Sequence, residues 1–453
     1  MGTTSSQHKK PLPTPRPRPV VEPAIQKQGQ KEKEKQQFKT IEHINKKYDF
    51  KLDTSIYDEW DTVNLFNSDP STYVEKPNLD MNQLNVRGLY HQYVTKNYEA
   101  MEKYYLQGIS LENVKSMRFL GRYHEDVTKN YEKMEKYYQM AIDKGDGDAI
   151  VNLGYYHQFT SKNYEEMKKY YQIGIDKGDG DAMVNLGNYY KSVVKDYVEM
   201  ERYYNMGIKV KNANAMYNFG YYHQKITRDY VKMTKYYKMA IDLGDCFSMI
   251  NLGSYYYDTA KDYAEMKKYY QMAIDLGDTN AMIAMGQYHE NITKNHAEMT
   301  KYYQMAIDLG DTNAMNELGS YHADVENYEK MKKYYQMAID LGNTNAMVNL
   351  GSYYESDSND KEAKKYYEMA VDLGDKNAMF CLGMFYLGEG KDSKMEKYFQ
   401  LGLNTEAKEE DFADDYEVDL GTIFSHLGRY YHATKQYEKM EECWLKAIEQ
   451  YKK

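Results

Sequence analysis

Six histidines recur at one position of a repeated segment, and these residues are the strongest candidates for metal chemistry in the chain. They are His91, His124, His157, His223, His289 and His322. Imidazoles aligned in this way could bind a metal ion or titrate together near neutral pH. Neighbouring helical repeats lie about 10 Å apart, however, whereas a metal–nitrogen bond is about 2 Å long. Tyrosine takes the same position in the other copies, at Tyr190, Tyr256, Tyr354, Tyr386 and Tyr431. We therefore interpret this column as a packing position with a polar tip, and we predict neither a metal site nor a cofactor.

Two short acidic sequences are similar to fragments of a calcium-binding loop. They are Asp146-Gly147-Asp148 and Asp179-Gly180-Asp181, and neither continues to the further acids and final glutamate of an EF-hand. Another copy has Asp311-Thr312-Asn313 at the same place, so we interpret all three as turns between repeats. The sequence also lacks the P-loop, zinc-protease and nucleophile-elbow motifs. We predict from this that the chain is not an enzyme.

The first residues of the chain fit a lipidation motif. Gly2 follows Met1, and Ser6 lies at the position that N-myristoylation requires. Four basic residues precede the first acid, at Lys9, Lys10, Arg16 and Arg18. An acyl chain on Gly2 together with these cations would give peripheral attachment to the inner face of a membrane. The alternative is an ordinary polar tail, because so short a motif often occurs by chance.

The elements that position all these residues follow from one marker, a glycine that comes after an apolar residue and before an aromatic pair in most copies. It occurs at Gly88, Gly121, Gly154, Gly187, Gly220, Gly253, Gly286, Gly319, Gly351, Gly383 and Gly428. The spacing is 33 residues seven times, then 32 twice, then 45. A fixed period in this range predicts stacked repeats, because a single unit cannot bury its own apolar face. We therefore predict an all-α, right-handed α-solenoid of about eleven helix–turn–helix repeats of 32–33 residues.

Each copy is predicted to contain two helices, as the segment 280–310 illustrates. Apolar residues recur there at helical spacing on both sides of a polar loop. Asn280 is predicted to cap the first helix; the second should begin near Ala297 and end at Leu309, with Gly310 in the left-handed conformation. A column of small residues in the second helix indicates close helix packing. Its members are Gly108, Ala141, Gly174, Gly207, Ala240, Ala273, Ala306, Ala338, Ala370, Gly402 and Ala447.

The repeat resembles the Sel-one-like repeat, a relative of the tetratricopeptide repeat. The shared string is K-Y-Y-x-M-A-I-D-L-G-D-x-x-A-M-x-x-L-G-x-Y-Y, which the segment 268–289 follows except at Met285 and His289. The loop between the two helices departs from the family, because its G-x-G-V sequence is mostly replaced by a shorter stretch. The resemblance implies an adaptor or scaffold for protein complexes. Copies this uniform and this rich in Tyr, Lys and Asn also look like repeats encoded by large DNA viruses or AT-rich protists.

The composition of the chain indicates its separate parts and the kind of protein it is. The net charge of −10 argues against a general nucleic-acid partner, and three widely separated cysteines fit a reducing, cytoplasmic setting. The alternative to a scaffold is a small catalytic region outside the repeats, but about forty residues rarely build a catalytic pocket. The predicted parts are a disordered Pro- and Lys-rich tail (1–37), a cap or linker (38–81), the solenoid (82–403), an acidic loop (404–418) and a final repeat (419–453).

Positions one and four residues after the marker glycine vary between copies, whereas the apolar columns do not. In a solenoid of helix pairs the first helices line the concave surface, which is the usual binding face. We therefore predict that a protein or peptide partner contacts these variable residues; the alternative is an unconstrained surface. The predicted contacts are Arg122, Tyr155, Gln158, Asn188, Lys191, Tyr221, Gln224, Tyr257 and Gln287.

Overall fold

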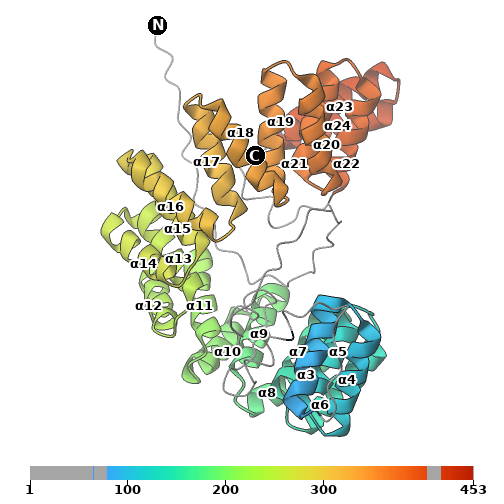
Figure 1. Ribbon diagram of the computed structural model, residues 1–453, viewed down its shortest axis with the longest axis vertical. Coiled ribbons are helices and arrows are strands. Elements are labelled where there is room, and N and C mark those ends of the chain that lie inside the picture. Colours follow the sequence, from blue (N-terminus) through green and yellow to red (C-terminus); the bar gives the residue numbers. More distant parts are fainter. Residues whose placement is uncertain (1–64, 66–78, 406–419, 452–453) are drawn as a thin grey trace. The chain divides into compact units, whose positions relative to one another are not determined.

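The computed structural model describes residue 65, residues 79–405 and residues 420–451, and these residues form a series of paired α-helices (Figure 1). Every predicted copy from Gly88 to Gly428 contains one pair, so the predicted all-α solenoid of helix–turn–helix repeats is confirmed. Odd-numbered helices are the first helices of the repeats and even-numbered helices are the second. The described helices divide into two compact units, an N-terminal unit that ends at Asp245 and a C-terminal unit that begins at Cys246.

The N-terminal unit contains five helix pairs. Its helices are α3 (Met81–Tyr90), α4 (Tyr98–Ser110), α5 (Val114–Asp126), α6 (Tyr131–Asp143), α7 (Gly147–Phe159), α8 (Tyr164–Asp176), α9 (Gly180–Tyr189), α10 (Tyr197–Lys209), α11 (Ala213–Tyr222) and α12 (Tyr230–Ile241). First helices of adjacent repeats contact one another, α7 with α9 and α9 with α11. The first helices of these repeats therefore form a continuous layer.

The C-terminal unit is built in the same way. Its helices are α13 (Cys246–Tyr255), α14 (Tyr263–Asp275), α15 (Thr279–Tyr288), α16 (His296–Asp308), α17 (Thr312–Asp324), α18 (Tyr328–Asp340), α19 (Thr344–Ser356), α20 (Asp360–Asp372), α21 (Lys376–Gly388), α22 (Asp392–Asn404), α23 (Leu420–Ala433) and α24 (Tyr437–Tyr451). Contacts between first helices recur here, α17 with α19 and α19 with α21.

The helix boundaries follow from caps. Asp278 rather than Asn280 caps α15, because Asp278 is extended and its carboxylate accepts a hydrogen bond from the Ala281 amide at 2.9 Å. Asn280 already lies inside the helix, so that prediction was two residues late. The end of α16 is as predicted: Gly310 has a φ of 84°, a left-handed conformation that glycine adopts without a steric penalty.

Five first helices end in a π-helical turn, which the periodicity of the sequence does not predict. These turns are η1 (His91–Thr95), η2 (Tyr190–Val194), η3 (His223–Thr227), η4 (Tyr256–Ala260) and η5 (His289–Thr293). All five lie in copies that precede Gly319, where the loop between the helices is one residue longer than in α17–α18. Two other copies of this length, α5–α6 and α7–α8, have no π turn, so the π turn is one of two ways in which the chain accommodates the additional residue.

Each marker glycine lies against an aromatic ring in the second helix of its own repeat. A Cβ atom on Gly253 would lie 2.6 Å from Cε1 of Tyr270, and the same atom on Gly121 would lie 2.6 Å from Cδ1 of Tyr138. Both tyrosines are fully buried. The two helices of a repeat therefore approach so closely that only glycine fits, which explains why the marker residue is the same in every copy.

The predicted small-residue column lies where the second helix meets the first helix of the next repeat. A Cβ atom on Gly174 would lie 2.7 Å from Cβ of Ala182, and Gly207 faces Ala215 at the same distance. Ala182 and Ala215 are fully buried. Small residues on both sides let the backbones of consecutive repeats approach closely, as the sequence predicted.

Candidate binding surface

Each histidine of the column stacks on a tyrosine of the second helix in the same repeat. The ring centroids of His157 and Tyr170 are 5.5 Å apart, with 8° between the ring planes. Where tyrosine takes the histidine position the same stack forms, as between Tyr256 and Tyr269, which lie 5.7 Å apart with 3° between the planes. The two residue types are therefore interchangeable at this position, and its interpretation as a packing position is confirmed.

Hydrogen bonds orient several of these imidazoles, and burial lowers the pKa of five of them. Nδ1 of His157 lies 3.0 Å from Oγ of Ser161, four residues later, and Nδ1 of His223 lies 2.9 Å from Oγ1 of Thr227. Burial is the main cause that lowers the pKa of five histidines, because desolvation disfavours the charged imidazolium. They are His124, His157, His223, His289 and His322. In the described part of the chain, no three His, Cys, Asp or Glu side chains gather closely enough to hold a metal ion.

The two Asp-Gly-Asp sequences lie at the junctions between repeats, as predicted, but only the first aspartate of each belongs to the turn, because α7 begins at Gly147 and α9 at Gly180. Asp146 caps α7 by accepting a hydrogen bond from the Ala149 amide at 2.9 Å, and Asp179 caps α9 through the Ala182 amide at 2.8 Å. Arg118 of the preceding repeat pairs with Asp146 and Asp148. These carboxylates are therefore occupied in helix capping and in contacts between repeats.

The buried tyrosines form hydrogen bonds with several of the predicted contact residues. The Tyr171 hydroxyl donates a hydrogen bond to Oε1 of Gln158 at 3.0 Å, and the Tyr237 hydroxyl donates to Gln224 at 2.7 Å. Oδ1 of Asn188 accepts a hydrogen bond from the Tyr204 hydroxyl in the same way. Sequence reasoning missed this role, although the interval of 13 residues from each glutamine to its tyrosine is a signal that could have revealed it.

The nine predicted contact residues differ widely in exposure. Arg122 and Tyr155 are exposed, and Arg122 pairs with Asp126 at 3.5 Å. Gln158 and Tyr257 are buried, and the Tyr257 ring lies 6.0 Å from that of Tyr263. The remaining five are partly buried: Asn188, Lys191, Tyr221, Gln224 and Gln287.

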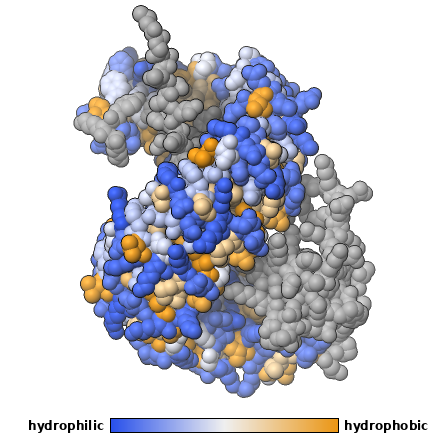
Figure 2. All heavy atoms as spheres, turned by 90° about the vertical axis from the view of Figure 1, so that its left-hand side faces the viewer, coloured by the Kyte–Doolittle hydropathy of each residue, from blue (hydrophilic) through white to orange (hydrophobic). Residues whose placement is uncertain are grey.

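We use the term first-helix face for the side chains one, four and five residues after the marker glycine in the odd-numbered helices and their π-helical ends. On this face, α7 presents two exposed aromatic residues, Tyr155 and Phe159, whose ring centroids are 4.4 Å apart. Phe159 was not among the predicted contacts. Elsewhere, the face of the molecule drawn in Figure 2 is largely hydrophilic with scattered hydrophobic side chains.

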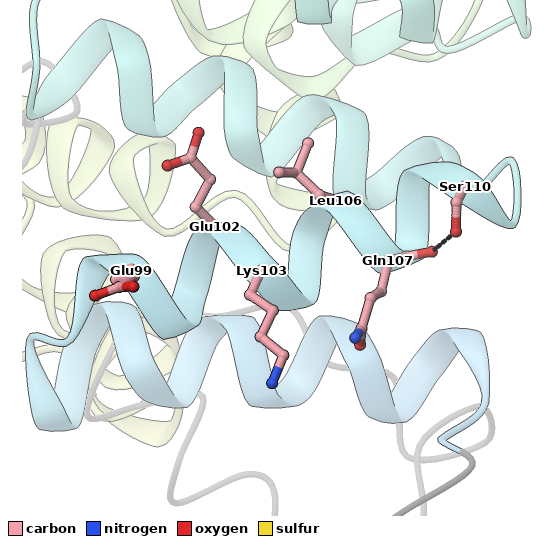
Figure 3. A pocket seen from close by; sticks show the side chains of 6 residues that line it. All are labelled: Glu99, Glu102, Lys103, Leu106, Gln107 and Ser110. Atoms are coloured by element: carbon pink, nitrogen blue, oxygen red, sulfur yellow. Dashed lines mark hydrogen bonds between the residues drawn. The ribbon is translucent and has the colours of Figure 1, made fainter.

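A shallow pocket lies along a second helix, away from the first-helix face. It is lined by residues of α4 alone, which Figure 3 shows: Glu99, Glu102, Lys103, Leu106, Gln107 and Ser110. The Ser110 hydroxyl donates to the Gln107 carbonyl at 2.7 Å, a bond within one helix. One lysine and two glutamates on the surface of a single helix are an ordinary solvated face, and they do not form a catalytic arrangement.

Several predictions concern residues outside the described part. Gly2, the tail 1–37, nearly all of the segment 38–81 and nearly all of the acidic loop 404–418 lie there. Within the described residues, none of the helices has both the length and the apolar character needed to cross a lipid bilayer.

Comparison with known proteins gives a family model and several solved structures. The model of the Sel1 repeat matches seven segments, which together cover just over half of the chain: 114–146, 147–179, 213–245, 247–278, 279–311, 312–343 and 344–375. Each segment begins at or next to the start of a first helix and ends in the turn after the second. A search of curated protein sequences gives no match.

Three of the solved structures that resemble the chain are bacterial proteins. A protective antigen of uropathogenic Escherichia coli with an SLR fold is 18% identical, with 83% of this chain and 95% of that chain covered and a TM-score of 0.39. A Sel1 repeat protein from Oxalobacter formigenes is 26% identical, with coverages of 49% and 100% and a TM-score of 0.37. An immunity protein from Pseudomonas aeruginosa is 21% identical, with coverages of 44% and 82% and a TM-score of 0.33.

The register of the matched segments agrees with the helix pairs of the structure. The marker glycines, the small-residue column and the turns between repeats fall at the same place, within one residue, in every matched segment. On these grounds, the chain belongs to the Sel1 repeat family.

Proposed function

We propose that this chain is a scaffold that binds a protein or peptide partner on its first-helix face. Proteins built from Sel1 repeats generally serve as scaffolds for protein–protein interaction. The observation that carries the proposal is the exposed aromatic pair of α7, because Tyr155 and Phe159 face solvent in a repeat whose other large aromatic residues are mostly packed. Exposed aromatic side chains dominate the energetics of many interfaces.

The contact set follows from exposure. The exposed members in the second and third repeats are Arg122, Asp126, Tyr155 and Phe159, and the face continues along α9 and α11 through Lys191 and Tyr221. Three further predicted contacts are held in place because each accepts a hydrogen bond from a buried tyrosine: Gln158, Gln224 and Asn188. Tyr257 is buried and is assigned to packing. No residue of this face is given a catalytic role, in keeping with a non-enzymatic scaffold.

Site-specific photocrosslinking tests this proposal. A photoreactive phenylalanine analogue placed at Tyr155 should crosslink to a partner protein in cells, because the ring would lie inside the interface. The same analogue at Glu165, whose side chain is 86% exposed on the second helix α8, is the matched control and should give little crosslinking. Equal yields at the two positions, or none at position 155, would contradict the proposal.

We also propose that Gly2 is myristoylated and that the chain is a cytoplasmic scaffold tethered to the inner face of a membrane. One myristoyl chain gives an association constant of only about 10⁴ M⁻¹. Four basic residues near it would each add about 1 kcal/mol toward an anionic leaflet. The motif at Met1–Ser6 and the cluster of cations supply both signals.

Intact mass spectrometry after expression in a eukaryotic host tests the tether. We expect the mass to increase by one myristoyl group, and we expect Gly2→Ala to move the chain from the membrane fraction to the supernatant. A Gly2→Ala variant that sediments with membranes as the parent does would contradict the tether, and it would leave the scaffold proposal intact.

A further inference from the structure

The aromatic pair on α7 is not required by the repeat. The position of Phe159 holds Asp126 and Ser192 in the adjacent copies, so packing does not demand an aromatic ring there. Phe159 is nevertheless 55% exposed, and its ring lies 4.4 Å from that of Tyr155, which is 38% exposed. The two rings therefore form an apolar surface that a partner side chain can cover.

Two lysines lie near the ring of Tyr221 in α11. Lys191 belongs to the π-helical end of α9, and Lys225 belongs to the π-helical end of α11. Nζ of Lys191 and Nζ of Lys225 each lie 5.9 Å from the centroid of the Tyr221 ring. Among the described residues, no carboxylate forms an ion pair with either ammonium group. Burial lowers the pKa of Lys191, because its ammonium group loses part of its solvation. An anion bound beside Tyr221 would supply that missing counter-charge.

The charged side chains of this face on α7, α9 and α11 are both lysines, whereas the adjoining face of α5 carries Glu125 and Asp126, the latter paired with Arg122. In the described helices α7, α9 and α11 with their π-helical ends, the first-helix face contains no aspartate or glutamate. The nearest acids on these helices, Asp148 and Asp181, lie at the opposite, N-terminal ends and bond to Arg118 and to Asn212 and Asn214. The same face in α13 to α19 carries Asp258, Glu290, Asp324 and Glu355.

We infer that the face formed by α7, α9 and α11 binds an acidic peptide segment that also carries aromatic or apolar side chains. This inference rests on the proposed function and identifies the chemistry of its partner. The acids would pair with Lys191 and Lys225, and an apolar side chain would cover Tyr155 and Phe159. Consecutive first helices pack about 10 Å apart, so the three helices span about 20 Å, or about six residues of extended chain.

An anionic nucleic acid could also use lysines and aromatic rings, but the charge of the chain favours a peptide. Nucleic-acid binding requires an extended basic surface that contacts many phosphates. This chain has a net charge of −10, and the face in question contains only two lysines. Two cations are enough to pair with a short acidic peptide, whereas a nucleic-acid strand requires more cations.

Fluorescence anisotropy with the full-length chain tests the inference. The probe is a labelled peptide of alternating aspartate and phenylalanine residues, and its counterpart has lysine in place of aspartate. We expect the acidic peptide to bind at least about tenfold more tightly, with an affinity that decreases as salt is added. Replacing both face lysines with glutamine (K191Q with K225Q) should weaken binding of the acidic peptide by about tenfold.

The matched control removes two lysines from second helices of the same unit. Lys136 and Lys169 also lie near tyrosine rings, at 5.7 Å and 5.5 Å, and K136Q with K169Q should leave binding unchanged. Equal affinity for the two peptides, an equal loss in the control, or tighter binding of a single-stranded uridine oligomer would overturn the inference. A partner that crosslinks at position 155 while the acidic peptide fails to bind would overturn this inference alone, and the proposed scaffold function would stand.

Discussion

Replacing Tyr171 with alanine should destabilise the N-terminal unit by about 3–5 kcal/mol, the usual cost of removing a large aromatic side chain from a core. The ring is fully buried and occupies the space that Gly154 leaves open between α7 and α8. It packs with Met167, Met183 and Leu186. Because each repeat buries its apolar face against its neighbours, a cavity here weakens the contact between repeats as well as one helix pair.

Two variants distinguish the contribution of the Tyr171 ring to stability from that of its hydroxyl group. Tyr171→Phe keeps the ring but leaves the buried Gln158 amide without its partner, which should cost about 1–3 kcal/mol. Combining it with Gln158→Leu should recover part of that loss. Denaturant unfolding followed by circular dichroism measures all three. If Tyr171→Ala were no more harmful than Tyr155→Ala, which removes an exposed ring from the same repeat, the buried tyrosine would not stabilise the fold.

Acidification should destabilise the repeats through the histidine column. Burial lowers the folded-state pKa of His124, His157, His223, His289 and His322 below the ordinary value of about 6.5. The unfolded chain then binds more protons than the folded chain as the pH falls below about 6.5, so the free energy of unfolding decreases. This stabilisation is complete above that pH and is lost as the pH falls through the lowered folded-state values.

Thermal unfolding between about pH 7.5 and pH 5 checks this prediction. We expect the midpoint temperature to fall by at least about 5 °C across this range. Replacing the five histidines with tyrosine is the matched control, because tyrosine forms the same ring stack in other copies, as Tyr190 does with Tyr203. The tyrosine variant should lose most of this pH dependence. An equal fall in both proteins would show that other groups cause the acid sensitivity.

The sequence predicted the architecture because its period is a direct consequence of packing. The glycine marker and the small-residue column both correspond to close helix approaches, at Gly253 against Tyr270 and at Gly174 against Ala182. Their spacing therefore indicated which helices touch, and the interchange of histidine with tyrosine indicated a packing position. Local boundaries were less accurate, since Asp278 and Asn280 are both suitable caps and only the backbone conformation distinguishes them.

The binding surface was harder to predict because variability does not reveal exposure. Gln158 varies between copies as a surface residue would, yet it is buried and bonded to Tyr171. Phe159 shows the converse. An aromatic residue in the sequence suggests a core position, yet Phe159 is exposed. The π-helical turns also change which side chains point outward at the end of a first helix, and periodicity alone does not predict such turns.

The most direct test of the scaffold account is a quantitative pull-down from cells that compares three forms of the full-length chain. The face variant carries Tyr155→Ala, Phe159→Ala and Tyr221→Ala. The control variant carries Leu106→Ala, Val198→Ala and Val231→Ala, which remove exposed apolar side chains from second helices of the same unit. We expect the face variant to lose the partners that the unmodified chain retains, and the control variant to keep them. If the face variant kept every partner while remaining folded, the first-helix face would not be the binding surface.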